Sequence, residues 1–373
     1  MSRSPEMKPW VAGIDPYVPG KARLADRPVV ARLASNENPF GPSPHAIAAM
    51  QAALTDSHRY PDPASTALRE ALGAHHGIDP ARIICGTGSD EILHLAAGAF
   101  AGPGDEIIHV RHGFAVYDIA TRRVGATPVV VPDRDWTCDV DAVLAAVTER
   151  TRVVFLANPN NPTGTIISAA EVRRLHAGLP TDCVFVLDAA YAEFAEGLYE
   201  DGIGLANEHA NVVAVRTFSK LYGLAAQRIG WAYAQGALID AMHRIRAPFN
   251  VPTTGQAAAI AAIADQAWAE KTRAHTLQWR AWLAGEIAAL GNAGLRAVPS
   301  AANFVLVEFP ADGPVTAAAA NTALLADGIL TRYLAVQNMP NCIRISIGTE
   351  AETRAAAASL RAFVEAATGT KAA

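Results

Sequence analysis

Short apolar segments rich in β-branched residues recur through the middle of this chain, and stretches with helical spacing separate them. Such segments are typical of strands that are buried on both faces. Strands that alternate with helices predict an α/β fold, in which a largely parallel sheet is covered by helices and ligands bind at the carboxyl ends of the strands. The expected strands are residues 82–86, 106–110, 128–131, 153–157, 184–187 and 212–215.

The pattern changes after residue 246. Residues 247–252 contain two prolines and predict a break, and an alanine-rich helix is expected over 254–290. The remaining sequence predicts a smaller α+β unit, with strands near 304–309, 329–333 and 343–347 and helices near 316–326 and from 350 onward. We therefore expect an N-terminal arm that belongs with the small domain at 1–35, a large domain at 36–252 and a small C-terminal domain at 253–373.

Composition restricts the class of protein. Of the 373 residues, 51% are hydrophobic and 18% are charged, so the chain can bury a large core. The formal net charge of −5 argues against a nucleic-acid partner, and no apolar run approaches the ~18 residues of a membrane span. The first 16 residues lack the apolar stretch of a secretory signal, and the four cysteines form no CxxC pair. We expect a cytoplasmic protein without a metal site or disulfides.

Two loops that follow expected strands are candidates for ligand binding. Residues 86–91, Gly-Thr-Gly-Ser-Asp-Glu, open a helix, and free N–H groups at a helix start can hold a phosphate. A plain tight turn is the alternative, because the segment matches neither GxGxxG nor a P-loop. Residues 158–164, Asn-Pro-Asn-Asn-Pro-Thr-Gly, form either a structural turn or a functional loop, and their place after a buried strand favours function.

Charged side chains stand where two further strands end. Asp188 ends an apolar strand, with Tyr191 three residues later. A carboxylate there is costly unless it is paired, although a helix N-cap would also explain it. Lys220 and Arg228 follow the next strand. A lysine in a partly buried pocket can be a Schiff-base nucleophile, whereas most lysines after strands are simply solvated.

A late pair of arginines completes the candidate residues. Arg344 alternates with apolar residues in an expected strand, and Arg332 precedes it by twelve residues. Each lies either on an exposed face or in a carboxylate clamp. In chain order, the phosphate-binding turn, an aromatic residue (Phe114), the asparagine loop, Asp188, Lys220 and Arg344 suit pyridoxal phosphate. This cofactor needs a lysine for its aldehyde, a carboxylate for its ring nitrogen and donors for its oxygens.

Taken with these residues, the chain resembles the fold-type-I pyridoxal-phosphate-dependent aminotransferases from about residue 14 to residue 364. The most specific matches are residues 33–43, 59–61, 88–91, 160–164 and 217–224, together with Arg344. The resemblance implies a large domain with a mostly parallel sheet, a smaller α+β domain, and a homodimer that acts on small molecules.

The resemblance also implies roles for the residues around the cofactor ring. Lys220 would bind the cofactor covalently and later move the substrate proton. Asp188 would pair with the protonated ring nitrogen, and Tyr191 and Asn161 would bind the phenolic oxygen. Phe114 occupies the position of the stacking aromatic residue. Lys220, Asp188 and Tyr191 are thus the expected catalytic residues.

Further positions match the family's phosphate-binding and substrate-binding residues. Tyr60 matches a tyrosine that reaches the cofactor phosphate of the partner subunit. Arg344 matches the arginine that binds the substrate carboxylate, and Arg332 a second anion-binding arginine. The other expected phosphate ligands are Ser89, Asp90, Ser219 and Arg228, and the other expected substrate-binding residues are Asn161 and Tyr17.

Within this family the chain is most similar to members that act on histidinol phosphate. The implied reaction transfers the amino group of L-glutamate to imidazole acetol phosphate, in histidine biosynthesis. The alternatives are an aromatic-amino-acid or prephenate aminotransferase, a threonine-phosphate decarboxylase, and a ligand-sensing regulator with a degenerate aminotransferase domain. Two positions depart from the family's pattern: Gln227 stands where an apolar residue is more frequent, and His112 where many members have proline.

Overall fold

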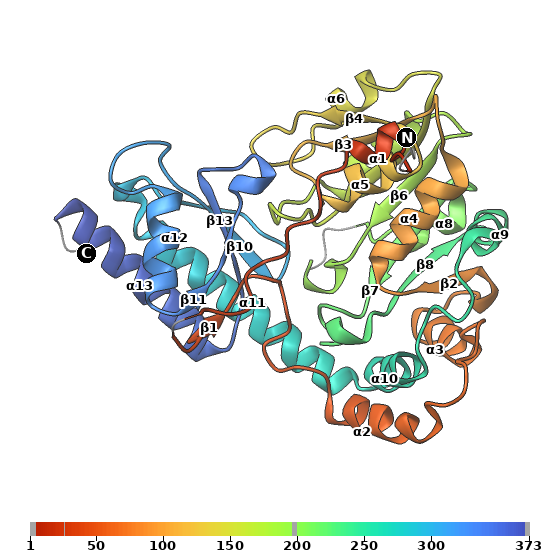
Figure 1. The fold of residues 1–373 in the computed structure, drawn as a ribbon, viewed down its shortest axis with the longest axis horizontal. Coiled ribbons are helices and arrows are strands. Elements are labelled where there is room, and N and C mark those ends of the chain that lie inside the picture. The colour runs from red at the N-terminus through yellow and green to blue at the C-terminus, as the bar shows by residue number, and fades with distance from the viewer. Residues whose placement is uncertain (1–4, 26, 196–199, 370–373) are drawn as a thin grey trace.

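A seven-stranded sheet forms the centre of the larger unit in this computed structural model, which describes residues 5–25, 27–195 and 200–369 (Figure 1). The strand order is β2-β8-β7-β6-β5-β3-β4, and every pair is parallel except those made by β8. The mostly parallel α/β fold is therefore confirmed. The strands are β2 (Ile83–Gly86), β3 (Glu106–Val110), β4 (Thr127–Val131), β5 (Thr151–Ala157), β6 (Val184–Asp188), β7 (Val212–Thr217) and β8 (Gly230–Ala234).

Helices cover both faces of this sheet, because its central strands are apolar on both sides. All residues of β6 and β7 are buried. One face packs against α4 (Ser89–Phe100), α5 (Val116–Arg123) and α9 (Gly236–Ile245). The helices on the other face are α3 (Thr66–His76), α6 (Val140–Ala145), α7 (Ala169–Ala177), α8 (Ile203–Glu208) and α10 (Thr253–Ala264).

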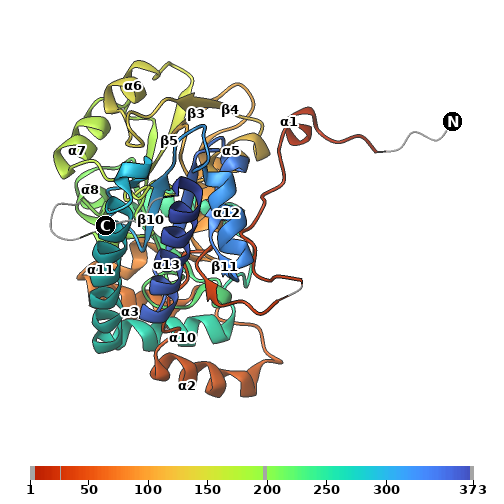
Figure 2. The same ribbon diagram turned by 90° about the vertical axis from the view of Figure 1, so that its left-hand side faces the viewer.

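The smaller unit is built on an antiparallel sheet of order β12-β13-β10-β9. These strands are β9 (Arg296–Val298), β10 (Phe304–Glu308), β12 (Arg332–Tyr333) and β13 (Cys342–Ser346). Its helices are α11 (Gln266–Ala288), α12 (Ala317–Ala326) and α13 (Glu350–Thr368). Figure 2 shows α11 and α13 side by side, where they pack on one core.

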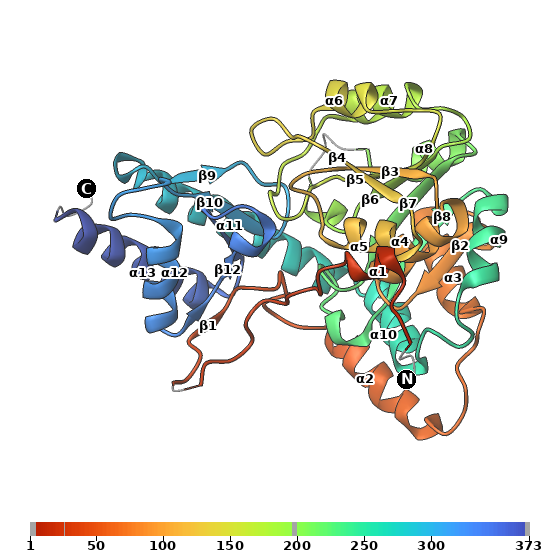
Figure 3. The same ribbon diagram turned by 45° about the horizontal axis from the view of Figure 1, so that its top comes forward.

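The single strand expected near 329–333 is wrong. The chain forms β11 (Ile329–Leu330), which pairs in parallel with β1 (Ala31–Arg32), and then changes sheet at Thr331 to form β12. The pairing of β1 with β11 joins the N-terminal arm to the small unit. The arm begins at α1 (Pro9–Ala12), which lies beside α5, so it contacts both units (Figures 1 and 3).

The single long helix expected over 254–290 is also wrong. It is divided into α10 and α11 at Asp265, whose carboxylate accepts a hydrogen bond of 3.2 Å from the Trp268 N–H and so caps α11. Helix α10 packs against α3 and α2 (Pro44–Ala53) and shares the core of the large sheet. We therefore propose that the domains divide at Asp265 rather than at residue 252.

Short 3₁₀ turns connect several of these elements: η1 (Leu54–Asp56), η2 (Pro80–Arg82), η3 (Ala192–Phe194), η4 (Ala225–Gln227), η5 (Gly291–Ala293) and η6 (Ala335–Gln337). Among the helices of the described residues, none has the length and apolarity needed to cross a membrane. The carboxyl ends of β5, β6 and β7 face the small unit, and the candidate site lies there.

Candidate functional site

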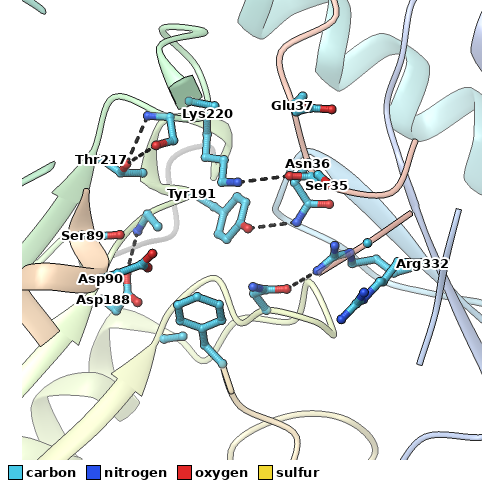
Figure 4. A pocket seen from close by; sticks show the side chains of 18 of the residues that line it. Ser35, Asn36, Glu37, Ser89, Asp90, Asp188, Tyr191, Thr217, Lys220 and Arg332 are labelled. Atoms are coloured by element: carbon cyan, nitrogen blue, oxygen red, sulfur yellow. Dashed lines mark hydrogen bonds between the residues drawn. The ribbon is translucent and has the colours of Figure 1, made fainter. Parts of the chain in front are cut away.

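A cavity of about 270 Å³ lies between the two units, where β5, β6 and β7 end. All but one of the predicted site residues line it: Tyr17, Ser89, Asp90, Phe114, Asn161, Asp188, Tyr191, Ser219, Lys220, Arg228, Arg332 and Arg344 (Figure 4). The exception is Tyr60, which is 81% exposed and lies outside the cavity of its own chain.

The Asp188 carboxylate is buried at the floor of this cavity, at the end of β6. It accepts hydrogen bonds of 2.9 Å from the Tyr117 hydroxyl and 3.2 Å from the Ala190 N–H. Burial raises the pKa of Asp188 to about 6, although the hydrogen bond from Tyr117 acts in the opposite direction. It has no ion-pair partner within the part of the chain that the structure describes. A buried carboxylate of this kind favours a cationic ligand.

The Lys220 side chain enters the cavity from the loop after β7, and its Nζ donates a hydrogen bond of 3.4 Å to the Ser35 carbonyl (Figure 4). Burial lowers the pKa of Lys220 to about 8, and the positive charge of Arg344 adds to this effect. A neutral amine, which is the nucleophilic form, is therefore accessible near physiological pH.

The Tyr191 ring lies between the Lys220 side chain and Asn36, which directly follows the N-terminal arm. Its centroid is 5.8 Å from Lys220 Nζ, and its hydroxyl accepts a hydrogen bond of 2.9 Å from Asn36 Nδ2. Burial raises the pKa of Tyr191 to about 12, so the phenol is neutral and can donate. Asn36 is held in turn by Ser346, whose Oγ donates to Asn36 Oδ1 at 2.9 Å.

Arg228, between η4 and β8, places its guanidinium beside the start of α4, at the end of the cavity expected to bind phosphate. Its guanidinium donates to Asp90 Oδ2 at 3.3 Å and to Ser219 Oγ at 3.4 Å. A Cβ on Gly88, whose φ is +82°, would lie 2.2 Å from Arg228 Nη2, so this approach requires glycine. The Asp90 carboxylate cannot bind an anion and instead pairs with Arg228. The groups that can donate hydrogen bonds to an anion here are the Arg228 guanidinium, the Ser219 hydroxyl and the free N–H groups at the start of α4.

Two buried guanidinium groups lie at the opposite side of the cavity. Arg332 Nη2 donates 2.6 Å to the Val18 carbonyl of the arm. Arg344 donates 2.8 Å to the Ala34 carbonyl and also to Asn161 Oδ1. Neither arginine forms an ion pair with a carboxylate in residues 5–25, 27–195 or 200–369. Burial lowers the pKa of Arg344 to about 10, and the charge of Arg332 adds to this effect.

His112 fixes the loops that carry Phe114 and Asn161. Its Nδ1 lies 2.8 Å from Asp133 Oδ1, and its carbonyl accepts a hydrogen bond of 2.8 Å from Asn160 Nδ2. Asn160 thus ties the loop after β3 to the loop after β5. The departure from proline at His112 leaves a polar anchor at this position.

The sequence interpretation missed Tyr117 and Asn36 as site residues. A signal for Tyr117 was available: it lies three residues after Phe114, just inside the helix that this loop opens, and the two rings make an edge contact at 5.9 Å. Asn36 belongs to the matched segment 33–43, but its bond to Tyr191 depends on the tertiary fold.

Comparisons with known proteins agree with this geometry. Residues 28–360 match the family described as aminotransferase class I and II. The chain is 55% identical over 359 residues to the histidinol-phosphate aminotransferase of Sphingopyxis alaskensis, covering 95% of this chain and 96% of that protein. It is 52% identical to that of Zymomonas mobilis, covering 98% and 99%. The solved structure of the Sinorhizobium meliloti histidinol-phosphate aminotransferase in complex with pyridoxal-5'-phosphate superposes with a TM-score of 0.90 at 33% identity, covering 98% and 99%.

Proposed function

This chain belongs to the class I and II aminotransferases, in the group of histidinol-phosphate aminotransferases, and from that premise we propose how its residues perform the reaction. The amino group of L-glutamate passes to imidazole acetol phosphate, which yields 2-oxoglutarate and L-histidinol phosphate in a reversible step of histidine biosynthesis. Pyridoxal phosphate is the cofactor.

The substrate assignment rests on one observation, the two buried guanidinium groups of Arg332 and Arg344. Each guanidinium is buried and lacks a carboxylate partner in the described parts of the chain, so a substrate anion would complete it. Glutamate brings two carboxylates, and histidinol phosphate brings one phosphate. Two arginines suit both substrates, because a guanidinium binds either oxyanion through paired hydrogen bonds.

The residues present fit pyridoxal phosphate. Asp188 is a buried carboxylate that no cation of the described residues pairs with, Lys220 is a primary amine with a lowered pKa, and Arg228 lies against Gly88 beside the start of α4. Asp188 would hold the ring nitrogen and Arg228 the phosphate. When bound, the cofactor supplies an electron sink for the bonding pair released at the substrate Cα.

Three side chains of the cavity act on the reacting groups in this proposal. Lys220 Nζ would hold the cofactor by its aldehyde and, once released, would move a proton between the substrate Cα and the cofactor C4′, as amino transfer requires and as its lowered pKa favours. The neutral Tyr191 hydroxyl donates to the phenolic oxygen, with Asn36 orienting it. Phe114 covers one face of the ring site and helps to exclude water.

The active form is a homodimer in this proposal, located in the cytoplasm. Tyr60 is 81% exposed and does not line its own cavity, which suits a residue that donates to the cofactor phosphate of the partner subunit. A tyrosine so exposed in a single chain otherwise gains little from its aromatic surface.

A panel of half-reactions tests the substrate assignment. The cofactor-loaded enzyme is mixed separately with histidinol phosphate, glutamate, phenylalanine and threonine phosphate, and the cofactor absorbance is followed for each. We expect rapid conversion with histidinol phosphate and glutamate. Faster conversion with phenylalanine than with histidinol phosphate would favour an aromatic aminotransferase, and CO₂ release from threonine phosphate would favour a decarboxylase.

A further inference from the structure

Tyr60 does not project alone: its ring stacks on the ring of Phe249 from the same chain. The two centroids are 4.5 Å apart with an angle of 23° between the rings. Phe249 is itself 40% exposed, so the pair forms an aromatic projection on the surface of the large unit. Stacking restricts the rotamers of both rings and thus fixes the direction in which the Tyr60 hydroxyl points.

The backbone of Phe249, which carries one ring of this stack, has a strained conformation. Its φ is +56°, in the left-handed region that bulky side chains rarely adopt. A conformation of this kind persists only where the surroundings fix it, and it is concentrated at functional positions. Here Arg246 provides the support, because its guanidinium bonds to the Asn250 side chain and donates 2.7 Å to the Pro63 carbonyl.

The segment around Phe249 also holds the segment that carries Tyr60. Besides the bond from Arg246 to Pro63, Gln256 Nε2 donates 3.1 Å to the Asp62 carbonyl and 3.0 Å to the Val251 carbonyl. With the ring stack at Tyr60 and the two hydrogen bonds at Asp62 and Pro63, residues 60–63 are therefore held to residues 246–256 at three positions.

The same segment reaches the phosphate end of its own cavity by two bonds. Asn250 Nδ2 donates a hydrogen bond of 2.7 Å to Glu91 Oε2, which also accepts one of 2.6 Å from the Thr87 N–H, in the turn that precedes α4. Thr254 Oγ1 donates 3.0 Å to Gln227 Oε1, immediately before Arg228. The Gln227 side chain thus anchors this segment beside Arg228, the proposed phosphate ligand.

We propose that Phe249 is a positioning residue that aims Tyr60 at the cofactor phosphate of the partner subunit. The inference rests on the proposed role of Tyr60 across the dimer. The left-handed backbone at Phe249 presents its ring to Tyr60, and the bonds of Asn250 and Thr254 fix that backbone to the phosphate end of its own site. Phe249 does not line the cavity of its own chain.

A double-mutant cycle on cofactor affinity tests the inference. Dissociation constants for pyridoxal phosphate are measured by titrating cofactor-free Tyr60→Phe, Phe249→Leu and the double variant. We expect Phe249→Leu to weaken binding about 2- to 12-fold, and to add nothing in the Tyr60→Phe background. Phe249→Tyr, which keeps the ring, should restore the native affinity. Trp10→Leu is the matched control, because Trp10 is 37% exposed and packs on Gly125, away from the cavity.

Mixed dimers distinguish positioning in trans from a general structural role. In one hybrid a wild-type subunit is paired with a Lys220→Ala/Phe249→Leu subunit, and in the other a Phe249→Leu subunit with a Lys220→Ala subunit. Only a site that retains Lys220 holds the cofactor covalently, and its absorbance reports that site. Binding should be weakened in the first hybrid and native in the second.

The outcomes separate the two proposals. If Tyr60→Phe binds the cofactor normally, the role of Tyr60 across the dimer is wrong and this inference falls with it. If Tyr60→Phe weakens binding but Phe249→Leu does not, or if their effects are additive, only the role of Phe249 is overturned. Equal weakening in both hybrids would also overturn it. Since Phe249 is 40% exposed, the leucine variant should fold, and its melting temperature checks this.

Discussion

Arg332 and Arg344 are direct cross-strand neighbours in the register of β12 and β13, so two guanidinium groups lie on one face of a buried antiparallel pair. Like charges at such positions repel each other. Their present partners are the carbonyls of Val18 and Ala34 and the amide of Asn161, all of them neutral. An anionic substrate would remove this repulsion, which explains how the cavity can select for negative charge.

Replacement of Arg332 should therefore depend on the substrate. A hydrogen bond to a charged group contributes about 1.5–3 kcal/mol, so Arg332→Ala should lower kcat/KM for histidinol phosphate by roughly 10- to 200-fold. The phosphate of histidinol phosphate carries about two negative charges and can engage both guanidinium groups, whereas phenylalanine brings one singly charged carboxylate and should be affected much less. Arg354→Ala is the control, because Arg354 pairs with Glu350 on the exposed face of α13. Equal losses for both substrates would contradict the role of Arg332 and favour an aromatic aminotransferase.

Asp188→Asn should separate function from stability. In its proposed role Asp188 keeps the ring nitrogen of the cofactor protonated, and the variant lacks that charge, so turnover should fall on the order of 100-fold or more. Without cofactor, however, the buried carboxylate is a cost: its pKa of about 6 lies above the ordinary 3.8, so stability is lost as pH rises from about 4 to 6. Cofactor-free Asp188→Asn should thus be more stable at pH 7, by up to roughly 3 kcal/mol. Urea unfolding of both cofactor-free proteins measures this, and near-normal turnover would reject the assignment.

The positions of Asp188 and Lys220 show what could be predicted from the sequence. Both follow apolar runs that read directly as buried strands, and the residues after such strands must lie at one edge of a parallel sheet. The missed strand β8, Gly-Trp-Ala-Tyr-Ala, lacks the β-branched pattern of the others. The division at Asp265 was missed because one capping residue interrupts an otherwise continuous helical composition.

Other features depend on tertiary contacts that no local pattern carries. The change of sheet at Thr331 arises because the arm supplies β1 as the partner of β11, and the arm is about 300 residues away in sequence. The hydrogen bond from Asn36 to Tyr191 likewise forms only when the segment after the N-terminal arm is folded against the large unit. The stacking of the Tyr60 ring on that of Phe249 also needs the folded chain, which brings two segments distant in sequence together.

The titration of Lys220 gives a prediction for the cofactor-free protein. Its pKa is about 8 in the folded chain and 10.5 ordinarily, so between these values the unfolded chain binds more protons and stability rises with pH. Cofactor-free Lys220→Met should lack this rise, and its stability advantage at pH 7 should vanish towards pH 10.5. Urea midpoints at several pH values measure the difference, and parallel curves for the two proteins would show that Lys220 titrates normally.

Covalent labelling tests the nucleophile itself. Borohydride reduction of the cofactor-loaded enzyme should fix the cofactor on one lysine, because only an amine in the cavity is held against the aldehyde. Lys220 is the lysine that lines the cavity among the described residues. Peptide mapping should therefore place the label on Lys220, and a label on Lys271, which lies over the rings of Phe40 and Trp268, would reject the assignment.

Shared active sites predict that two inactive subunits can restore each other. A Lys220→Ala subunit lacks the nucleophile but keeps Tyr60, whereas a Tyr60→Phe subunit keeps Lys220 but donates no hydroxyl to its partner. In their mixed dimer, the Lys220 of the second subunit meets the Tyr60 of the first, so one complete site should form.

We expect mixing to raise activity above that of either parent, in proportion to the fraction of mixed dimers measured by native mass spectrometry. The measurement requires that Tyr60→Phe alone is strongly impaired, as expected from the loss of a hydrogen bond to a charged phosphate. Mixed dimers that form but never exceed their parents would show that each subunit completes its own site.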